Sequence, residues 1–350
     1  MKVTLVLLGI LATAHTVSAQ PHYFLQPASL VSSGGNAINE DGSVTGWQQD
    51  GSIERAFITH AGNVSGPSLQ SNDVAMGLDV DLFDGQEQVV GTIGSGLSAY
   101  AVAWRSEFSP PQFLPYPDSK KPAFGAAAAS QQRDFRAAGW VHIDNRTKAV
   151  IWTGDTIIGF EGLYAKLPEE QIESRFYDLK QVGHADAYVG FLRTEGLHYR
   201  PIMYFWDYEN NHYWFYLPEI AGWIQSSAKA VNSNGVAVGF AMFSDSSTTA
   251  VRWDSSGVTY IPKLPGHTAC YAQSINNDGW VVGYCGMQWA GRRAFVFDGK
   301  YTYDLTTLVD NGQEWVIQEA NGINSNDGTI VGTGTYRRDG QTHAVTLKPH

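Results

Sequence analysis

The sequence has few charged residues and little positive charge. Charged side chains make up 16% of its 350 residues, against about 25% in an average domain. The formal net charge is -11. Attraction to phosphate groups requires net or clustered positive charge. We therefore expect no nucleic-acid partner and no general binding to anionic membranes.

Long apolar runs are absent after the first residues. Lys2 is followed by an apolar run over residues 3–14 and by small residues that end at Ala19, which is the order found in secretory signals. We predict that residues 1–19 are a signal peptide and that the mature chain begins near Gln20, in a secreted or extracytoplasmic location. The apolar run is too short to cross a bilayer, and no later stretch approaches about 20 consecutive apolar residues. We expect no membrane span.

Cysteine is scarce, with only Cys270 and Cys285 in the chain. The two cysteines flank one predicted hairpin. If Asn277 and Asp278 form its two-residue loop, antiparallel pairing places Cys270 directly opposite Cys285, close enough for a disulfide. An exported chain permits this bond, and we predict it in preference to two buried thiols.

Motifs that bind metals or cofactors are also absent. The two thiols lack nearby ligands at a familiar spacing, and no phosphate-binding loop, zinc-binding motif or nucleophile elbow is found. We expect no metal site and no cofactor. Two sequons, at Asn63 and Asn145, matter only if the host glycosylates exported proteins.

Glycine and aromatic residues are abundant, with 37 Gly, 11 Trp, 17 Tyr and 16 Phe. Turn-rich, aromatic-rich chains are typically all-β. One unit recurs, in which Ile-Asn-x-x-Gly-x-Val-x-Gly is followed by a loop and then by Ala-Phe/Val-x-Trp/Phe. Its clearest copies begin at Ala37, Ala230, Ser274 and Gly322, and weaker copies end at Gly91, Gly139 and Gly190. The last glycines of the seven copies lie 44 to 51 residues apart.

A period of this length, with several short strands in each unit, is typical of propeller blades, which bury their faces only by stacking on neighbours. The segment from His22 to Leu25 matches the last strand of a unit, and the final unit stops at Leu347, just short of that strand. We predict an all-β fold in which residues 20–350 form a single seven-bladed β-propeller, with the N-terminal strand closing the last blade. An open β-solenoid is the alternative, although its repeats are usually shorter.

These units resemble the extracellular HAF repeats, which are named for a His-Ala-Phe strand that follows an Ile-Asn-x-x-Gly-x-Val-Val-Gly hairpin. The final unit contains Thr342-His343-Ala344-Val345, whereas other units contain Arg55-Ala56-Phe57 or Arg293-Ala294-Phe295, so the histidine is mostly replaced. The resemblance covers nearly the whole mature chain. It implies export and a propeller-like fold, and it supplies no catalytic residues because the family has no agreed activity.

Arginine is concentrated in the loops between the second and third strands of the units, which should surround one end of the central channel. Eight of the 13 arginines lie there: Arg55, Arg146, Arg193, Arg200, Arg292, Arg293, Arg337 and Arg338. Guanidinium groups bind carboxylates and sulfates through two parallel hydrogen bonds. The cluster predicts an anionic ligand, and an acidic polysaccharide is the natural candidate for an exported protein. For any single arginine, solvation of a strand end is the better explanation, and the collective bias toward these loops is the stronger signal.

Aromatic residues on the same loops are candidates for stacking on sugar rings, because aromatic rings offer flat apolar faces with polar tips. They are Trp47, Tyr100, Tyr199, Trp289 and Tyr336. The sequence thus favours a carbohydrate-binding propeller with an Arg-rich and aromatic-rich loop face.

Two other functions stay open on the sequence alone. A polysaccharide lyase would need a cation beside the substrate carboxylate and a base for the neighbouring proton, and His142, His198 and Tyr199 are the candidates for that base. A glycosidase would need paired carboxylates, and no spacing selects a pair. A protein-interaction scaffold is the third possibility, since propellers present variable loops on a rigid frame.

Overall fold

The computed structural model of the chain describes residues 20–29, 31–60, 75–83, 86–94, 99–104, 109–116, 123–129, 135–143, 146–154, 156–159, 171–194, 198–207, 212–218 and 220–350. The predicted signal peptide (residues 1–19) and both sequon asparagines, Asn63 and Asn145, lie outside these residues. None of the described helices is long and apolar enough to cross a membrane.

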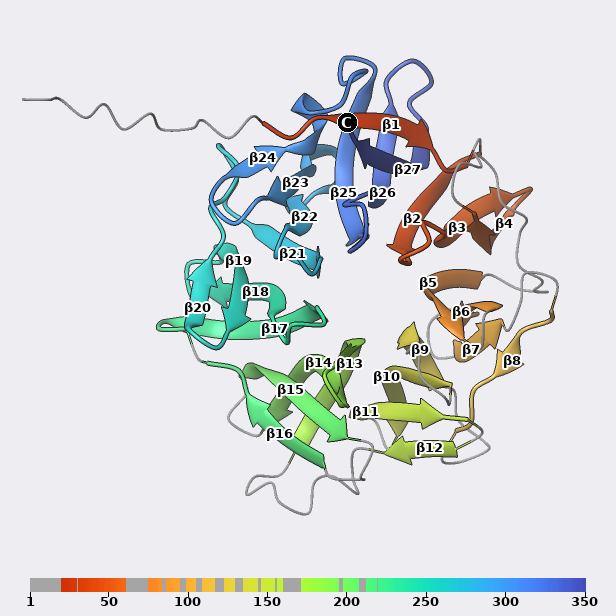
Figure 1. Cartoon of the computed structure of the whole chain (residues 1–350), viewed down its shortest axis with the longest axis vertical. Helices are drawn as coiled ribbons and strands as arrows, with labels where there is room; N and C mark the ends of the chain where they lie inside the picture. Colours follow the sequence, from red (N-terminus) through yellow and green to blue (C-terminus); the bar gives the residue numbers. More distant parts are fainter. Residues whose placement is uncertain are drawn as a thin grey trace, which may run out of the picture.

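Twisted antiparallel sheets stand in a ring around a central axis (Figure 1). The strands divide into consecutive groups, which we call blades. Blade 1 contains β2 (Ser33–Ile38), β3 (Val44–Asp50) and β4 (Ile53–Thr59), and blade 2 contains β5 (Ala75–Phe83), β6 (Gln86–Ile93), β7 (Tyr100–Trp104) and β8 (Gln112–Phe113). Blade 3 contains β9 (Ala123–Ala129), β10 (Arg136–Ile143), β11 (Arg146–Thr153) and β12 (Thr156–Gly159).

Blade 4 contains β13 (Gln171–Val182), β14 (Ala185–Thr194), β15 (Tyr199–Asp207) and β16 (His212–Tyr216), and blade 5 contains β17 (Trp223–Val231), β18 (Ala237–Phe243), β19 (Thr248–Asp254) and β20 (Gly257–Tyr260). Blade 6 contains β21 (Cys270–Ile275), β22 (Val281–Cys285), β23 (Arg293–Phe297) and β24 (Thr302–Asp304). Blade 7 contains β25 (Trp315–Ile323), β26 (Ile330–Tyr336), β27 (Thr342–Pro349) and β1 (Tyr23–Pro27). Blades 4 and 5 form one continuous sheet, joined by a single parallel bridge between Tyr199 and Gln225.

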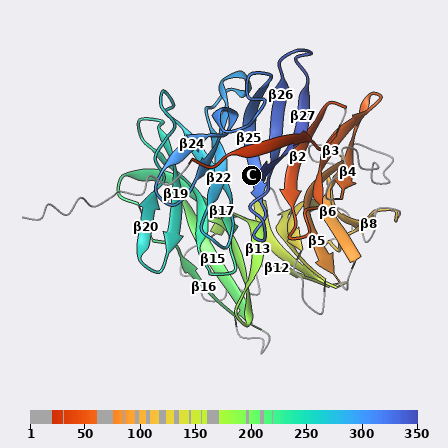
Figure 2. The same ribbon diagram turned by 45° about the horizontal axis from the view of Figure 1, so that its top comes forward.

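The N-terminal strand closes the ring, as predicted. β1 pairs antiparallel with β27, from Tyr23 opposite Pro349 to Pro27 opposite Val345. The next strand in the chain, β2, packs against β26 and begins blade 1. The strands β1 and β27 are thus held in the same blade, as Figures 1 and 2 show.

Apolar side chains are buried between neighbouring blades. In the described residues, seven clusters of buried apolar side chains each draw on two adjacent blades, including the pair formed by blades 7 and 1. The largest buried side chains include Trp104, Trp152 and Trp253, which the repeat places in the third strand of blades 2, 3 and 5. The indole of Trp152 donates to the carbonyl of Pro115 (2.7 Å), so its polar atom is satisfied in the core.

The repeated asparagine joins one blade to the next. The side-chain oxygen of Asn232 accepts the backbone N–H of Val236 (3.0 Å) and thereby closes its own hairpin turn. Its amide donates to the carbonyl of Asn276 in the following blade (2.9 Å). Asn324 makes the same bond to the carbonyl of Asn39 (2.7 Å), across the junction of blades 7 and 1.

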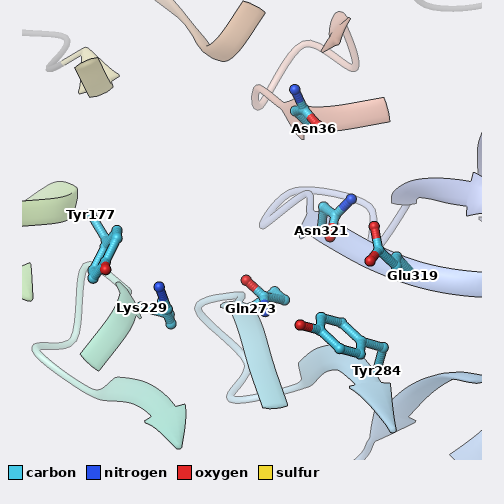
Figure 3. Close-up of a pocket in the computed structure, with 7 residues that line it drawn as sticks. All are labelled: Asn36, Tyr177, Lys229, Gln273, Tyr284, Glu319 and Asn321. Atoms are coloured by element: carbon cyan, nitrogen blue, oxygen red, sulfur yellow. The ribbon is translucent and has the colours of Figure 1, made fainter. Parts of the chain in front are cut away.

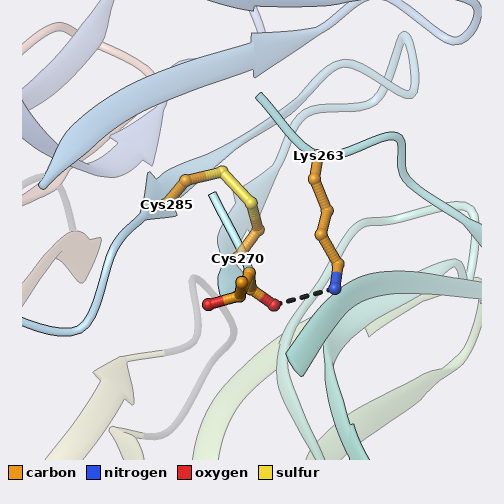
Figure 4. Close-up of a disulfide and its surroundings, with 4 residues drawn as sticks. Lys263, Cys270 and Cys285 are labelled. Carbon is orange, nitrogen blue, oxygen red and sulfur yellow. Dashed lines mark hydrogen bonds between the residues drawn. A yellow bond between two sulfur atoms is a disulfide. The ribbon is translucent and has the colours of Figure 1, made fainter. Parts of the chain in front are cut away.

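Cys270 and Cys285 form a disulfide, as predicted from the hairpin register. The two residues are directly opposite each other on β21 and β22, with their Cα atoms 4.0 Å apart. The chain that leads into β21 is held by Lys263, whose ammonium donates to the carbonyl of Thr268 (2.8 Å; Figure 4). The disulfide therefore links the first two strands of blade 6, beside the connection from blade 5.

Candidate functional site

A β-bulge in each of five innermost strands turns one side chain toward the central axis. At these bulges the pairing skips Asn36 in β2, Tyr177 in β13, Lys229 in β17, Gln273 in β21 and Asn321 in β25. A bulge re-aims a side chain in this way because two residues of one strand oppose a single residue of its partner. All five side chains line one cavity.

The bulge explains why the repeat ends in glycine. This glycine lies on the second strand of the blade, opposite the bulge of the first strand. A Cβ atom on Gly239 would be 2.0 Å from the carbonyl oxygen of Ser227, and one on Gly332 would be 1.9 Å from that of Glu319. Such distances are impossible for a side chain, so only glycine fits. The last glycine of the repeat is thus required by the bulge that forms the channel wall, whereas other glycines are required by the turns.

The cavity lies at the centre of the ring and has a volume of about 370 Å³. Tyr284 and Glu319 complete its lining, and Figure 3 shows the seven labelled side chains distributed around the opening. Amide, phenol, carboxylate and ammonium groups make up most of this wall. The cavity therefore suits a polar ligand rather than an apolar one.

Lys229 is the cation of the cavity. Its ammonium lies 3.3 Å from the centre of the Tyr177 ring, a cation–π contact. Among the residues that the structure describes, it makes no ion pair with a carboxylate. Burial, with a smaller contribution from the positive charge of Arg175, lowers the pKa of Lys229 to about 7. The group can therefore gain or lose its proton near neutral pH.

Glu319, in contrast, has a cationic partner. The guanidinium of Arg292 donates to its carboxylate and lies 4.5 Å from the centre of the Tyr284 ring. Burial raises the pKa of Glu319, and Arg292 opposes that effect. The negative charge in the cavity is thus neutralised from within the chain, whereas the positive charge of Lys229 is not.

A second cavity of about 240 Å³ adjoins the first and shares Tyr177 with it. Glu173 organises its charged wall, accepting hydrogen bonds from Arg175 and from the hydroxyl of Tyr199 (both 3.1 Å) and lying 3.7 Å from Arg193. Burial and the neighbouring Glu173 charge raise the pKa of Tyr199. The phenol therefore stays protonated at neutral pH and acts as a hydrogen-bond donor.

The structure places the predicted arginines at the ends of strands, where most bind groups of this chain. Arg193 and Arg292 pair with the cavity carboxylates already described, Arg55 pairs with Asp50 (2.7 Å), and Arg338 pairs with Glu314. The other contacts are Arg200 over the Tyr216 ring (3.7 Å), Arg293 to the carbonyl of Arg292 (2.7 Å) and Arg337 to the carbonyl of Trp315 (3.4 Å). Arg146 is exposed at the start of β11. The contacts named above tie these guanidinium groups to different partners within the chain.

The predicted aromatic residues are also separated from one another. Trp47 lies in β3 rather than in a loop, and its ring covers Gly34, where a Cβ atom would be 2.5 Å from the indole nitrogen. Tyr100 packs edge-on against Phe113, and Tyr336 packs against Trp315. Trp289 lies in the short helix η4 (Trp289–Gly291), 39% exposed and beside Arg292.

The predicted catalytic candidates are not brought together. His142 lies in β10, where its carbonyl accepts the Tyr116 hydroxyl (2.6 Å). His198 is exposed, and its Nδ1 contacts the carbonyl of Ile224 (2.9 Å). Neither histidine lines either of the two cavities described above, whereas Tyr199 lines the smaller one.

The residues at the axis were not among those predicted from the sequence, although the sequence contains a signal for them. Asn36, Lys229, Gln273 and Asn321 each stand three residues before the repeat asparagine. Simple alternation along a strand does not reveal this position, because the bulge interrupts the alternation there. The last glycine of the repeat, which lies opposite the bulge, also indicates this position.

No protein-family model matches the sequence, and no curated protein is similar to it at the sequence level. Among solved structures, the chain is similar to YCF48 bound to a D1 peptide, with a TM-score of 0.53 and 10% identity over 93% of this chain and 94% of that one. It is also similar to TolB from Acinetobacter baumannii (TM-score 0.49, 11% identity, 89% of this chain) and spans 64% of TolB's length. A third similar structure is the BP39L lectin from Burkholderia pseudomallei (TM-score 0.45, 10% identity, 92% of this chain and 98% of that one). The fold is a β-propeller.

Proposed function

We propose that this protein is an exported β-propeller that binds an acidic glycan, with one carboxylate-bearing sugar unit entering the central cavity. The observation that carries this proposal is Lys229, whose ammonium lines the cavity with no carboxylate partner among the described residues. A ligand carboxylate would supply the missing counter-charge through a charge-assisted hydrogen bond. The ligand therefore enters at the axis rather than along the arginine rim.

The rest of the cavity wall suits a hydroxylated ligand. Gln273 and Asn321 offer amide donors and acceptors, and Tyr177 offers a ring face together with a hydroxyl group. Sugars present both hydroxyl groups and flat C–H faces, which these groups complement. The adjoining cavity, lined by Arg175 and Tyr199, extends the surface toward a second sugar unit.

Export is part of the same proposal. It is supported by the N-terminal pattern of residues 1–19 and by the disulfide between Cys270 and Cys285, a bond that persists in oxidising compartments. Membership of the HAF-repeat group is likewise a proposal, supported by the repeat motif and its spacing.

Binding to uronate oligosaccharides, compared with carboxyl-reduced oligosaccharides of the same length, tests the function. We expect the native chain to prefer the acidic series and Lys229→Met to lose about tenfold to a hundredfold in affinity for it, since a hydrogen bond to a charged group contributes about 1.5–3 kcal/mol. Lys229→Arg should keep the preference. Lys348→Met, at an exposed lysine of β27, is the matched control and should bind normally. Equal binding of both oligosaccharide series by the native chain would refute the proposal.

A polysaccharide lyase is the second candidate, favoured by the near-neutral pKa of Lys229. In its neutral form the amine could take the proton adjacent to a uronate carboxylate, while the glycosidic oxygen at the next carbon accepts a proton from water and departs as an alcohol, leaving a C=C bond between the two carbons. Ultraviolet absorbance of the unsaturated product in the same incubations would identify this reaction. Binding without that product supports a binding module. If the protein shows neither binding nor product, a protein-interaction scaffold becomes the leading hypothesis.

A further inference from the structure

Three metal-ligating side chains meet where the ring closes. His22 immediately precedes β1, His350 follows β27, and Asp310 lies in the connection between the short helix η5 (Leu305–Thr307) and β25. The Nδ1 atom of His22 is 3.1 Å from one oxygen of Asp310, and the Nε2 atom of His350 is 3.0 Å from the other. All three ligand atoms lie within 4.8 Å of one another, and all three residues are exposed.

The backbone holds these residues in place. The N–H of His350 donates to the carbonyl of His22 (3.1 Å), and the N–H of Asp310 donates to the carbonyl of Tyr23 (3.2 Å). A third bond joins the N–H of Tyr23 to the carbonyl of Leu308 (2.8 Å). The three side chains are therefore positioned by the closed blade, even though they lie on the surface.

We propose that His22, Asp310 and His350 form a binding site for a divalent transition-metal ion such as Zn²⁺, which fastens the N-terminal strand to the C-terminal strand. Two imidazole nitrogens and a carboxylate oxygen are ligands that zinc prefers. Ligand atoms in a tetrahedral zinc site, at about 2.0–2.1 Å from the metal, lie roughly 3.3 Å apart. The distances from His22 Nδ1 to Oδ1 of Asp310 (3.1 Å) and from His350 Nε2 to Oδ2 of Asp310 (3.0 Å) are close to that spacing.

The exposure of the site leaves the remaining coordination positions to water. No metal motif is visible in the sequence because almost the whole chain separates His22 from Asp310 and His350. The competing explanation is a hydrogen-bonded cluster in which both imidazoles contact the Asp310 carboxylate without serving as a metal site.

Zinc titration of the untagged, chelator-treated chain, by calorimetry and by thermal unfolding, separates the two explanations. We expect one Zn²⁺ per chain and a rise of a few degrees in Tm, because a ligand that binds only the folded state stabilises it. His22→Ala and His350→Ala should each weaken zinc affinity at least tenfold and abolish the Tm shift. Asp310→Asn tests the third ligand and keeps the side-chain shape.

His184→Ala removes an exposed histidine of the turn between β13 and β14 and is the matched control. It should bind zinc as the native chain does. The proposal is overturned if the native chain, His22→Ala and His350→Ala give the same zinc isotherm and the same Tm shift.

Discussion

Lys229 is partly buried, and its burial sets the pH range in which the central cavity carries a positive charge. An ordinary lysine, with a pKa near 10.5, is fully protonated at neutral pH, whereas burial lowers the pKa of Lys229 to about 7. The ammonium form therefore predominates below that pH and the neutral amine above it. A bound carboxylate would favour the charged form and raise this pKa.

The pH dependence of binding follows from that equilibrium. Affinity for an acidic oligosaccharide should fall by about tenfold or more between pH 6 and pH 8.5, as Lys229 loses its proton and the charge-assisted bond is lost. Lys229→Arg should bind with little change over the same range, because guanidinium stays charged. Isothermal titration at three pH values measures both. A native profile that is flat over this range would show that Lys229 does not contact the ligand carboxylate.

At the scale of elements, the hairpin between the first and second strands of a blade closes its own turn and contacts the next blade. Asn232 performs both roles, with its oxygen bound to the N–H of Val236 and its amide bound to the carbonyl of Asn276. Its side chain is buried. Buried polar groups that lose their partners destabilise the fold more than exposed ones.

Asn232→Ala should therefore lower the free energy of unfolding by about 2–3 kcal/mol, because it removes bonds within the turn and between blades 5 and 6. Asn234→Ala, which removes a single exposed bond to Asn277, should lower it by less than about 1 kcal/mol. Urea unfolding of both variants measures the difference. Equal losses would show that the buried bonds of Asn232 contribute no more than the exposed bond of Asn234.

At the scale of the whole molecule, stability depends on closure of the ring by β1. Leu25 is buried, at 7% exposed, and belongs to the cluster between blades 6 and 7 together with Leu347. Phe24, its neighbour in the same strand, is 53% exposed on the opposite face. Substitution by aspartate at each of the two positions therefore tests whether the fold depends on docking of the buried face of β1.

Leu25→Asp should lower the free energy of unfolding by roughly 3 kcal/mol or more, because it buries a carboxylate in an apolar cluster. Phe24→Asp should change it by less than about 1 kcal/mol, as is usual at an exposed position. Urea unfolding and size-exclusion chromatography measure the loss and any association through an opened edge. Similar stability of the two variants would indicate that the ring does not depend on β1.

The sequence by itself determined the features that depend on local periodicity. The repeat of turn and strand motifs specified the blades, because Asn and Gly close hairpins where a positive φ is needed, as at Gly235 (φ 74°). Register counted from such a turn placed Cys270 opposite Cys285. The N-terminal strand was recognisable because His22 to Leu25 matches the strand that the last unit lacks.

Only the tertiary structure decided which side chains meet. The bulges that turn Lys229 and Gln273 to the axis interrupt the alternation of the strands, so strand alternation alone did not identify the side chains that line the channel. The loop arginines looked available in the sequence, whereas Arg292 binds Glu319 from the neighbouring blade. His22 and His350 become neighbours only when the ring closes. The physical reason is that propeller sites are assembled across blades, whereas sequence periodicity describes one blade at a time.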